Sequence, residues 1–195
     1  MGKKTRSKHR RAKLKSVKKV SLSQQIKPYL SLRHPITRFC LLFVGLLVVF
    51  SLLLYQEPIR HYFSNPVTTL IASQVAWILK ALGMKVYASG IIIYGESFSV
   101  RIVGNCNAIF EIFMFLSAVI AFPALQKEKL MGGISGIIFI YFINLLRLVL
   151  LFLIGVYAPQ YFEEAHLYVG QSFFIVMVAI FWLFWVGKCV KYVPT

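Results

Sequence analysis

Acidic residues and cysteines are both scarce in this sequence. Only 6 of its 195 residues are Asp or Glu, against 22 Lys and Arg, and the first acid is Glu57. The three cysteines, Cys40, Cys106 and Cys189, are widely spaced and form no C-x-x-C pair, which excludes a disulfide framework and leaves only single-thiol chemistry. No period of about 20–50 residues recurs, so a repeat array is also excluded. We expect neither a metal ion nor another cofactor.

Polar residues are too few for a soluble domain. Hydrophobic residues make up 58% of the chain, whereas soluble domains contain about 45–50%. A hydrocarbon core of about 30 Å needs roughly 20 mainly apolar residues per crossing helix. We therefore predict an all-α integral membrane protein, a four-span helical bundle. Its crossings are residues 37–55, 107–125, 130–156 and 167–187.

The positive charge is concentrated before the first crossing. Thirteen of the 22 basic residues precede Cys40. A polybasic block beside a membrane span stays in the cytoplasm and is attracted to anionic lipid, and this block lacks the interleaved aromatic residues that stack on bases. We therefore predict a basic cytoplasmic tail over residues 1–36 and a membrane-embedded domain over residues 37–195, with the lipid bilayer as partner and no nucleic acid.

The remaining basic residues predict the orientation. With the N-terminus inside, four crossings place 17 basic residues in the cytoplasm and 4 outside, with one inside a span, as the positive-inside rule requires. Both termini of this multi-pass protein of the cell (inner) membrane are then cytoplasmic, and residues 56–106 lie outside. The count requires that the amphipathic residues 66–83 lie on the outer surface. A fifth crossing there is the alternative, and it would place Cys106 on the opposite side.

Two short apolar runs precede the second crossing. Residues 90–94 and 98–103 flank a turn that contains Gly95. Alternating runs joined by a glycine-containing turn are typical of a β-hairpin. An unpaired strand edge is not tolerated in hydrocarbon, so we expect a small hairpin outside the membrane.

Three chemically distinctive side chains are predicted at one level, near the outer boundary. Cys106 directly precedes the second crossing, and His166 directly precedes the fourth. Arg147 lies 17 residues beyond Leu130, which is about 25 Å along a core of about 30 Å. A buried cysteine or an interfacial histidine is common when it occurs alone. Their combination with a charge inside a span points to a catalytic site.

Each of the three has a local context that suits catalysis. Asn105 or Asn107 can cap the helix that follows Cys106, and a helix start or a nearby cation lowers the pKa of a thiol. Arg147 is a permanent charge in apolar surroundings, which costs about 2.5–3.5 kcal/mol or more at mid-membrane, so such residues usually have a function. Asn144 lies on the same helical face and can orient the guanidinium. Snorkelling of Arg147 to the interface is the alternative.

His166 is the candidate acid and base. An imidazole with a pKa near neutrality can activate a thiol and later protonate a leaving amine. Glu163 or Glu164 can support its ring, although capping of the helix N-terminus explains these two acids equally well.

At these residues the sequence resembles the exosortase/archaeosortase family, and its length and Cys-Asn pair resemble the H-type branch. The resemblance covers roughly residues 66–185. Many members carry Gly two positions after the cysteine, where this chain has Ala108. The matching stretches are Gly104-Asn-Cys-Asn-Ala-Ile-Phe-Glu111, Ala121-Phe-Pro123, Asn144-Leu-Leu-Arg147 and Ala165-His-Leu-Tyr168, followed by an aromatic last helix.

The resemblance implies a membrane cysteine transpeptidase. Its substrates are exported proteins with a C-terminal sorting tail, which consists of a short motif, a hydrophobic span and basic residues. It implies that Cys106 forms a thioester, with Arg147 and His166 as partners, and that an acceptor amine or lipid, not identified by the sequence, resolves it. Two other classes remain open: a small transporter or channel subunit that uses Arg147, and a non-catalytic membrane scaffold.

Overall fold

The computed structural model describes residues 35–103 and 106–189. Residues 1–34 of the predicted basic tail and Asn105 lie outside the described residues, and the domain boundary after residue 36 stays a prediction. In chain order the elements are α3 (Pro35–Tyr55), α4 (Glu57–Ile59), η1 (Arg60–Ser64), α5 (Asn65–Ala81), β1 (Val86–Ser89), β2 (Ile92–Gly95), β3 (Ser99–Arg101), α6 (Ile109–Ala121), α7 (Gln126–Tyr157), η3 (Pro159–Tyr161), α8 (Phe162–Glu164), η4 (Ala165–Gly170) and α9 (Gln171–Cys189).

Helices of membrane-spanning length agree with three of the four predicted crossings. In the part of the chain that the structure describes, Pro35–Tyr55, Gln126–Tyr157 and Pro159–Lys188 are long and apolar enough to cross a bilayer. The last of these joins η3, α8, η4 and α9. The chain is therefore a mainly helical membrane protein.

The second predicted crossing, residues 107–125, is shorter than expected. The apolar helix α6 has 13 residues, about 20 Å at 1.5 Å per residue. It starts late because Ala108 adopts a left-handed conformation. It ends early because Pro123 forces the preceding Phe122 into an extended conformation, at φ −72° and ψ 137°.

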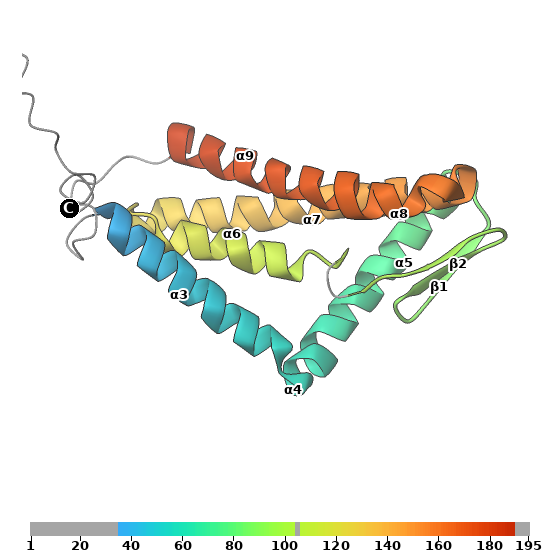
Figure 1. Ribbon diagram of the computed structural model, residues 1–195, viewed down its shortest axis with the longest axis horizontal. Helices are drawn as coiled ribbons and strands as arrows, with labels where there is room; N and C mark the ends of the chain where they lie inside the picture. Colours follow the sequence, from blue (N-terminus) through green and yellow to red (C-terminus); the bar gives the residue numbers. More distant parts are fainter. Residues whose placement is uncertain (1–34, 104–105, 190–195) are drawn as a thin grey trace, which may run out of the picture. The chain divides into compact units, whose positions relative to one another are not determined.

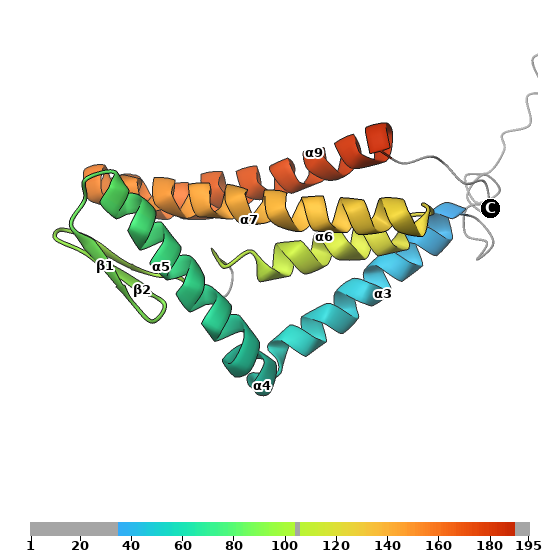
Figure 2. The ribbon, with the colours of Figure 1, turned by 180° about the vertical axis from the view of Figure 1, so that it is seen from behind.

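Helices α6, α7 and α9 lie side by side (Figures 1 and 2). Two glycines of α7 allow this close approach. A Cβ at Gly136 would lie 2.0 Å from the Phe115 ring of α6, and one at Gly132 would lie 2.2 Å from the Trp185 indole of α9. Phe115 and Trp185 belong to one buried cluster contributed by the three helices. The bundle is thus held by large aromatic side chains packed directly on the α7 backbone.

The predicted hairpin is part of a larger sheet. Strands β2 and β3 are antiparallel, with Ile93 opposite Val100, and they correspond to the two predicted runs. A third strand, β1, pairs with β2 so that Val86 lies opposite Gly95. The sequence prediction missed β1, because a four-residue strand that follows a loop carries too little alternation to be distinguished from that loop.

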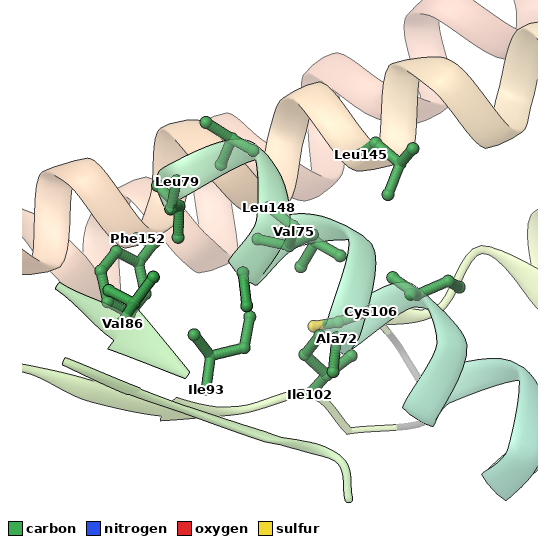
Figure 3. Packing of buried hydrophobic residues seen from close by; sticks show 13 residues of the cluster. Ala72, Val75, Leu79, Val86, Ile93, Ile102, Cys106, Leu145, Leu148 and Phe152 are labelled. Atoms are coloured by element: carbon green, nitrogen blue, oxygen red, sulfur yellow. The ribbon is translucent and has the colours of Figure 1, made fainter. Parts of the chain in front are cut away.

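Helix α5 packs on this sheet and on α7. Its buried side chains lie on one face, at the helical spacing of Ile71, Val75 and Leu79. They form a core with the sheet and with α7, and Figure 3 shows Cys106 at the edge of this core with its sulfur beside Ala72 and Ile102. The predicted amphipathic helix therefore exists, with its buried face turned to the protein.

Candidate active site

Cys106 lies between the sheet and α6. Its backbone N–H donates a hydrogen bond to the Val103 carbonyl over 2.8 Å, and only 4% of its surface is exposed. Two residues later, Ala108 has φ 60° and ψ 5°, the left-handed region that L-residues other than glycine rarely adopt. This reversal lets the chain leave the sheet, pass Cys106 and enter α6 within a few residues.

The structure brings Cys106 and His166 into contact. The Sγ atom of Cys106 lies 3.7 Å from Nε2 of His166, although 60 residues separate the two in sequence. His166 belongs to η4, whose turns are wider than those of an α-helix. Its ring stacks on Phe162, with centroids 6.0 Å apart and planes at 6°. The Phe162 ring supports the imidazole by stacking, and the charge of Glu163, one of the two acids predicted to support the ring, acts on it.

Two asparagines hold the Cys106 segment in place. Asn144 of α7 donates from Nδ2 to the Cys106 carbonyl over 3.2 Å. Asn107 accepts the Ile109 N–H at 3.1 Å through Oδ1, and its Nδ2 donates to Ser64 and Thr68 at 3.0 Å each. Asn107 thus accepts the first backbone N–H of α6, although the N-cap position itself is Ala108.

The predicted role of Asn144 is different in the structure. It was expected to orient the Arg147 guanidinium, but its amide hydrogen bond goes to the backbone of Cys106. Asn144 and Arg147 are both on α7, but the Asn144 amide reaches the adjacent loop that carries Cys106. Asn144 therefore links α7 to the thiol-bearing segment.

The charge of Arg147 acts on both Cys106 and His166. Its side chain is buried, and Nε, Nη1 and Nη2 have no hydrogen-bond partner among the described residues. The guanidinium lies over the Phe174 ring, with Cζ 5.4 Å from the centroid, a cation–π contact that offsets part of the cost of burying the charge. Arg147 thus retains hydrogen-bonding capacity that the described protein groups do not use.

The pKa of the Cys106 thiol is opposite in direction to the prediction. Burial raises this pKa above its ordinary value, and the smaller opposing effect of the Arg147 charge lowers it. A buried thiolate loses hydration that one nearby cation does not replace. The thiol is therefore neutral at rest, and it needs a base at the moment of reaction.

Glu111 is a buried acid near the thiol that was not among the predicted site residues. It lies on the first turn of α6, 4% exposed, and its Oε2 has no hydrogen-bond partner among the described residues. Its charge acts on Cys106, and the charge of Arg147 acts on it. A lone acid within an apolar helix is itself a signal of function, so the sequence contained the information needed to select it.

One cavity contacts the thiol, and a larger groove lies next to that cavity. A small cavity of about 20 Å³ contacts Cys106, His166 and Phe162. A groove of about 690 Å³ runs past Tyr55, Thr68 and Asn107. Arg101 and Ile102 line both, so the groove lies next to the cavity that contacts the thiol.

The fold and this site together define a class: helical membrane proteins with a buried thiol and imidazole in contact. A family model described as transmembrane exosortase matches residues 30–183. That match covers most of the 195 residues, so the chain belongs to the transmembrane exosortase family, which confirms the family resemblance. Comparisons with curated proteins and with solved structures gave no match. Family membership suggests a membrane transpeptidase that acts through a cysteine on exported proteins. The H-type branch stays a prediction.

Proposed function

We propose that this protein is a cysteine transpeptidase that cleaves the C-terminal sorting signal of exported proteins through a thioester on Cys106. The observation that best supports this proposal is the 3.7 Å contact between the Cys106 thiol and His166 Nε2. A nucleophile within reach of a base is the arrangement that covalent acyl transfer needs. Neither the transporter nor the scaffold hypothesis explains why these two groups meet.

The first half of the reaction forms the thioester. Nε2 of His166, unprotonated at the start, accepts the thiol proton as the sulfur attacks the peptide carbonyl carbon and the carbonyl π electrons move to oxygen. The tetrahedral intermediate collapses, the C–N bond breaks, and the imidazolium of His166 gives its proton to the leaving amine. Because burial raises the pKa of Cys106, this proton transfer accompanies the attack.

The second half releases the product. The acceptor amine attacks the thioester carbonyl and loses its proton to His166, and the C–S bond breaks. The sulfur then takes back that proton as a thiol, which restores the starting state. Water in place of the amine would give hydrolysis by the same route.

Arg147 is proposed to stabilise the oxyanion of both tetrahedral intermediates. Its charge already acts on the Cys106 thiol, and its three nitrogens have no partner among the described residues. A preorganised donor in a water-poor site stabilises developing charge more than the same donor does in water.

The active site is proposed to lie on the outer face of the cell membrane. This follows from the basic residues before Cys40 and the positive-inside rule, with cytoplasmic termini and with α6 as a short second crossing. Reporter fusions at Gly95 and Lys127 are expected to show opposite sidedness. The same sidedness at both positions would rule out this topology.

The test of the reaction is an immunoblot of a tail-bearing substrate in cells. Cys106→Ala and Cys106→Ser, which keeps the side chain's size, are both expected to leave uncleaved substrate while the protein stays in the membrane fraction. The control replaces Cys40 and Cys189 together and is expected to cleave normally. Full cleavage by either Cys106 variant would leave the transporter and scaffold hypotheses standing.

A further inference from the structure

A second cavity lies between α7 and the segment formed by η4 and α9. Its volume is about 130 Å³, similar to the cavity of about 150 Å³ that binds benzene in an engineered protein. Every lining residue except one is apolar or glycine. The exception is Arg147, and the main apolar walls are Ile143, Leu146, Leu150, Phe173 and Phe174.

The guanidinium in this cavity has no hydrogen-bonded partner among the described residues, and Glu111, the buried acid on which its charge acts, makes no hydrogen bond to it. The Arg147 side chain is only 7% exposed, it lines the cavity, and its three nitrogens have no hydrogen-bond partner among the described residues. A planar guanidinium matches the oxygens of a phosphate or a carboxylate. An anionic occupant would supply the hydrogen-bond acceptors that the three nitrogens lack.

The walls identify the rest of that occupant. Leu146, Leu150 and Phe173 line the cavity and are 54%, 49% and 58% exposed. They belong to α7 and α9, helices of membrane-spanning length, so their exposed surfaces face lipid. An occupant that enters from this side meets hydrocarbon first and the cation last. It is an amphiphile with an anionic group at the end of an apolar chain.

The depth of Arg147 agrees with a phospholipid. Arg147 lies 17 residues beyond Leu130, about 25 Å along a hydrocarbon core of about 30 Å. It is therefore within a few ångströms of the headgroup level at one face. A lipid phosphate can meet the guanidinium there without leaving its own depth in the bilayer.

We propose that this cavity binds a phospholipid, with its phosphate on Arg147 and an acyl chain against Leu146, Leu150 and Phe173. This lipid site is independent of the proposed reaction. Its assignment to the outer leaflet of the membrane rests on the proposed topology. The guanidinium carries five N–H donors, enough to bind a phosphate on one edge and a peptide oxyanion on another.

Native mass spectrometry of the full-length protein in detergent tests this site. The probes are palmitoyl-oleoyl phosphatidylglycerol, which has a phosphate but no amine, and the diacylglycerol with the same chains. Wild-type protein is expected to retain the phospholipid about tenfold more strongly, as a charge-assisted hydrogen bond predicts. Arg147→Gln is expected to lose this preference. Arg101→Gln, the same change at a residue outside the cavity lining, is expected to keep it.

A second variant leaves the charge in place. Leu150→Trp is expected to fill the cavity and reduce phospholipid retention while Arg147 remains, and it decides the question if Arg147→Gln does not fold. Equal retention of the two lipids, or equal behaviour of the two arginine variants, would overturn the proposal. Displacement of the lipid by an equal concentration of inorganic phosphate would also overturn it, since the site would then bind a free anion. No cleavage is measured, so a negative result leaves the proposed reaction untouched.

Discussion

Asn144 and Arg147 are three residues apart on α7, and both are buried, but they differ in how their hydrogen bonds are used. Asn144 donates to the Cys106 backbone, whereas Arg147 has no partner among the described residues. The structure therefore fixes the backbone of Cys106 and leaves the hydrogen-bond donors of Arg147 unused by the described residues. Fixed positions and uncommitted donors are what preorganised stabilisation of a transition state requires.

Arg147→Lys tests the unused hydrogen-bond donors of Arg147 and is expected to have the largest effect. Lysine keeps the charge but loses the planar, multi-donor group. The loss of one oxyanion donor typically lowers the rate by about 10²–10³-fold. Cleavage of a tail-bearing substrate by inserted protein measures this. Near-normal cleavage by the lysine variant would show that Arg147 acts only as a charge or as a membrane anchor.

Asn144→Leu tests the hydrogen bond that fixes the Cys106 backbone. The variant removes the hydrogen bond to the Cys106 carbonyl and leaves that acceptor buried, which costs about 1–3 kcal/mol. Denaturant unfolding in detergent is expected to show this loss, and cleavage should fall with it because the thiol drifts from His166. Ser135→Ala is the control, since its exposed hydroxyl bonds only within α7, and it should change stability by less than about 0.5 kcal/mol. Equal stability of the two variants would contradict the role of Asn144.

The pH dependence of thiol labelling sharpens the comparison. Burial raises the pKa of Cys106 and Arg147 lowers it, so the reactive thiolate appears only as pH rises through the raised value. An ordinary thiol has a pKa of about 8.5. In a chain without Cys40 and Cys189, the midpoint of iodoacetamide labelling should therefore lie above about pH 8.5. Arg147→Gln removes the lowering influence and should move the midpoint higher, whereas Arg101→Gln serves as the control. A lower midpoint in the Arg147 variant would show that its charge does not act on the thiol.

Ala108→Gly is expected to have the smallest effect. A left-handed backbone costs an L-residue about 1–2 kcal/mol, which glycine avoids, while the loss of a buried methyl group costs roughly 0.8 kcal/mol. The net result should be a slight stabilisation. Ala118→Gly, the same change inside α6, should instead destabilise by about 1 kcal/mol. Unfolding of the two variants in detergent should therefore shift in opposite directions, and a shift in the same direction would contradict the strain at Ala108.

The sequence predicted the long helices well, because length and apolar content suffice to detect a span. It also selected Cys106 and His166, which the structure brings into contact. The bounds of α6 were harder, since they depend on the left-handed turn at Ala108 and on how Pro123 ends the helix. The pKa of the Cys106 thiol was predicted to be lowered, but it is raised. Burial of the thiol by the sheet and α5 raises this pKa more than the helix start and the Arg147 cation lower it. The catalytic roles of the site residues stay predictions.

The number of residues in η4 determines the direction in which His166 points. It covers the six residues Ala165–Gly170 and joins α8 to α9 with i→i+5 rather than i→i+4 hydrogen bonding. Deleting one residue between His166 and α9 would allow ordinary helical winding and turn the imidazole by about 100° around the helix axis. Every side chain of the site would still be present, yet the imidazole would no longer point at the sulfur. Helical phase is thus as much a requirement of this site as residue identity.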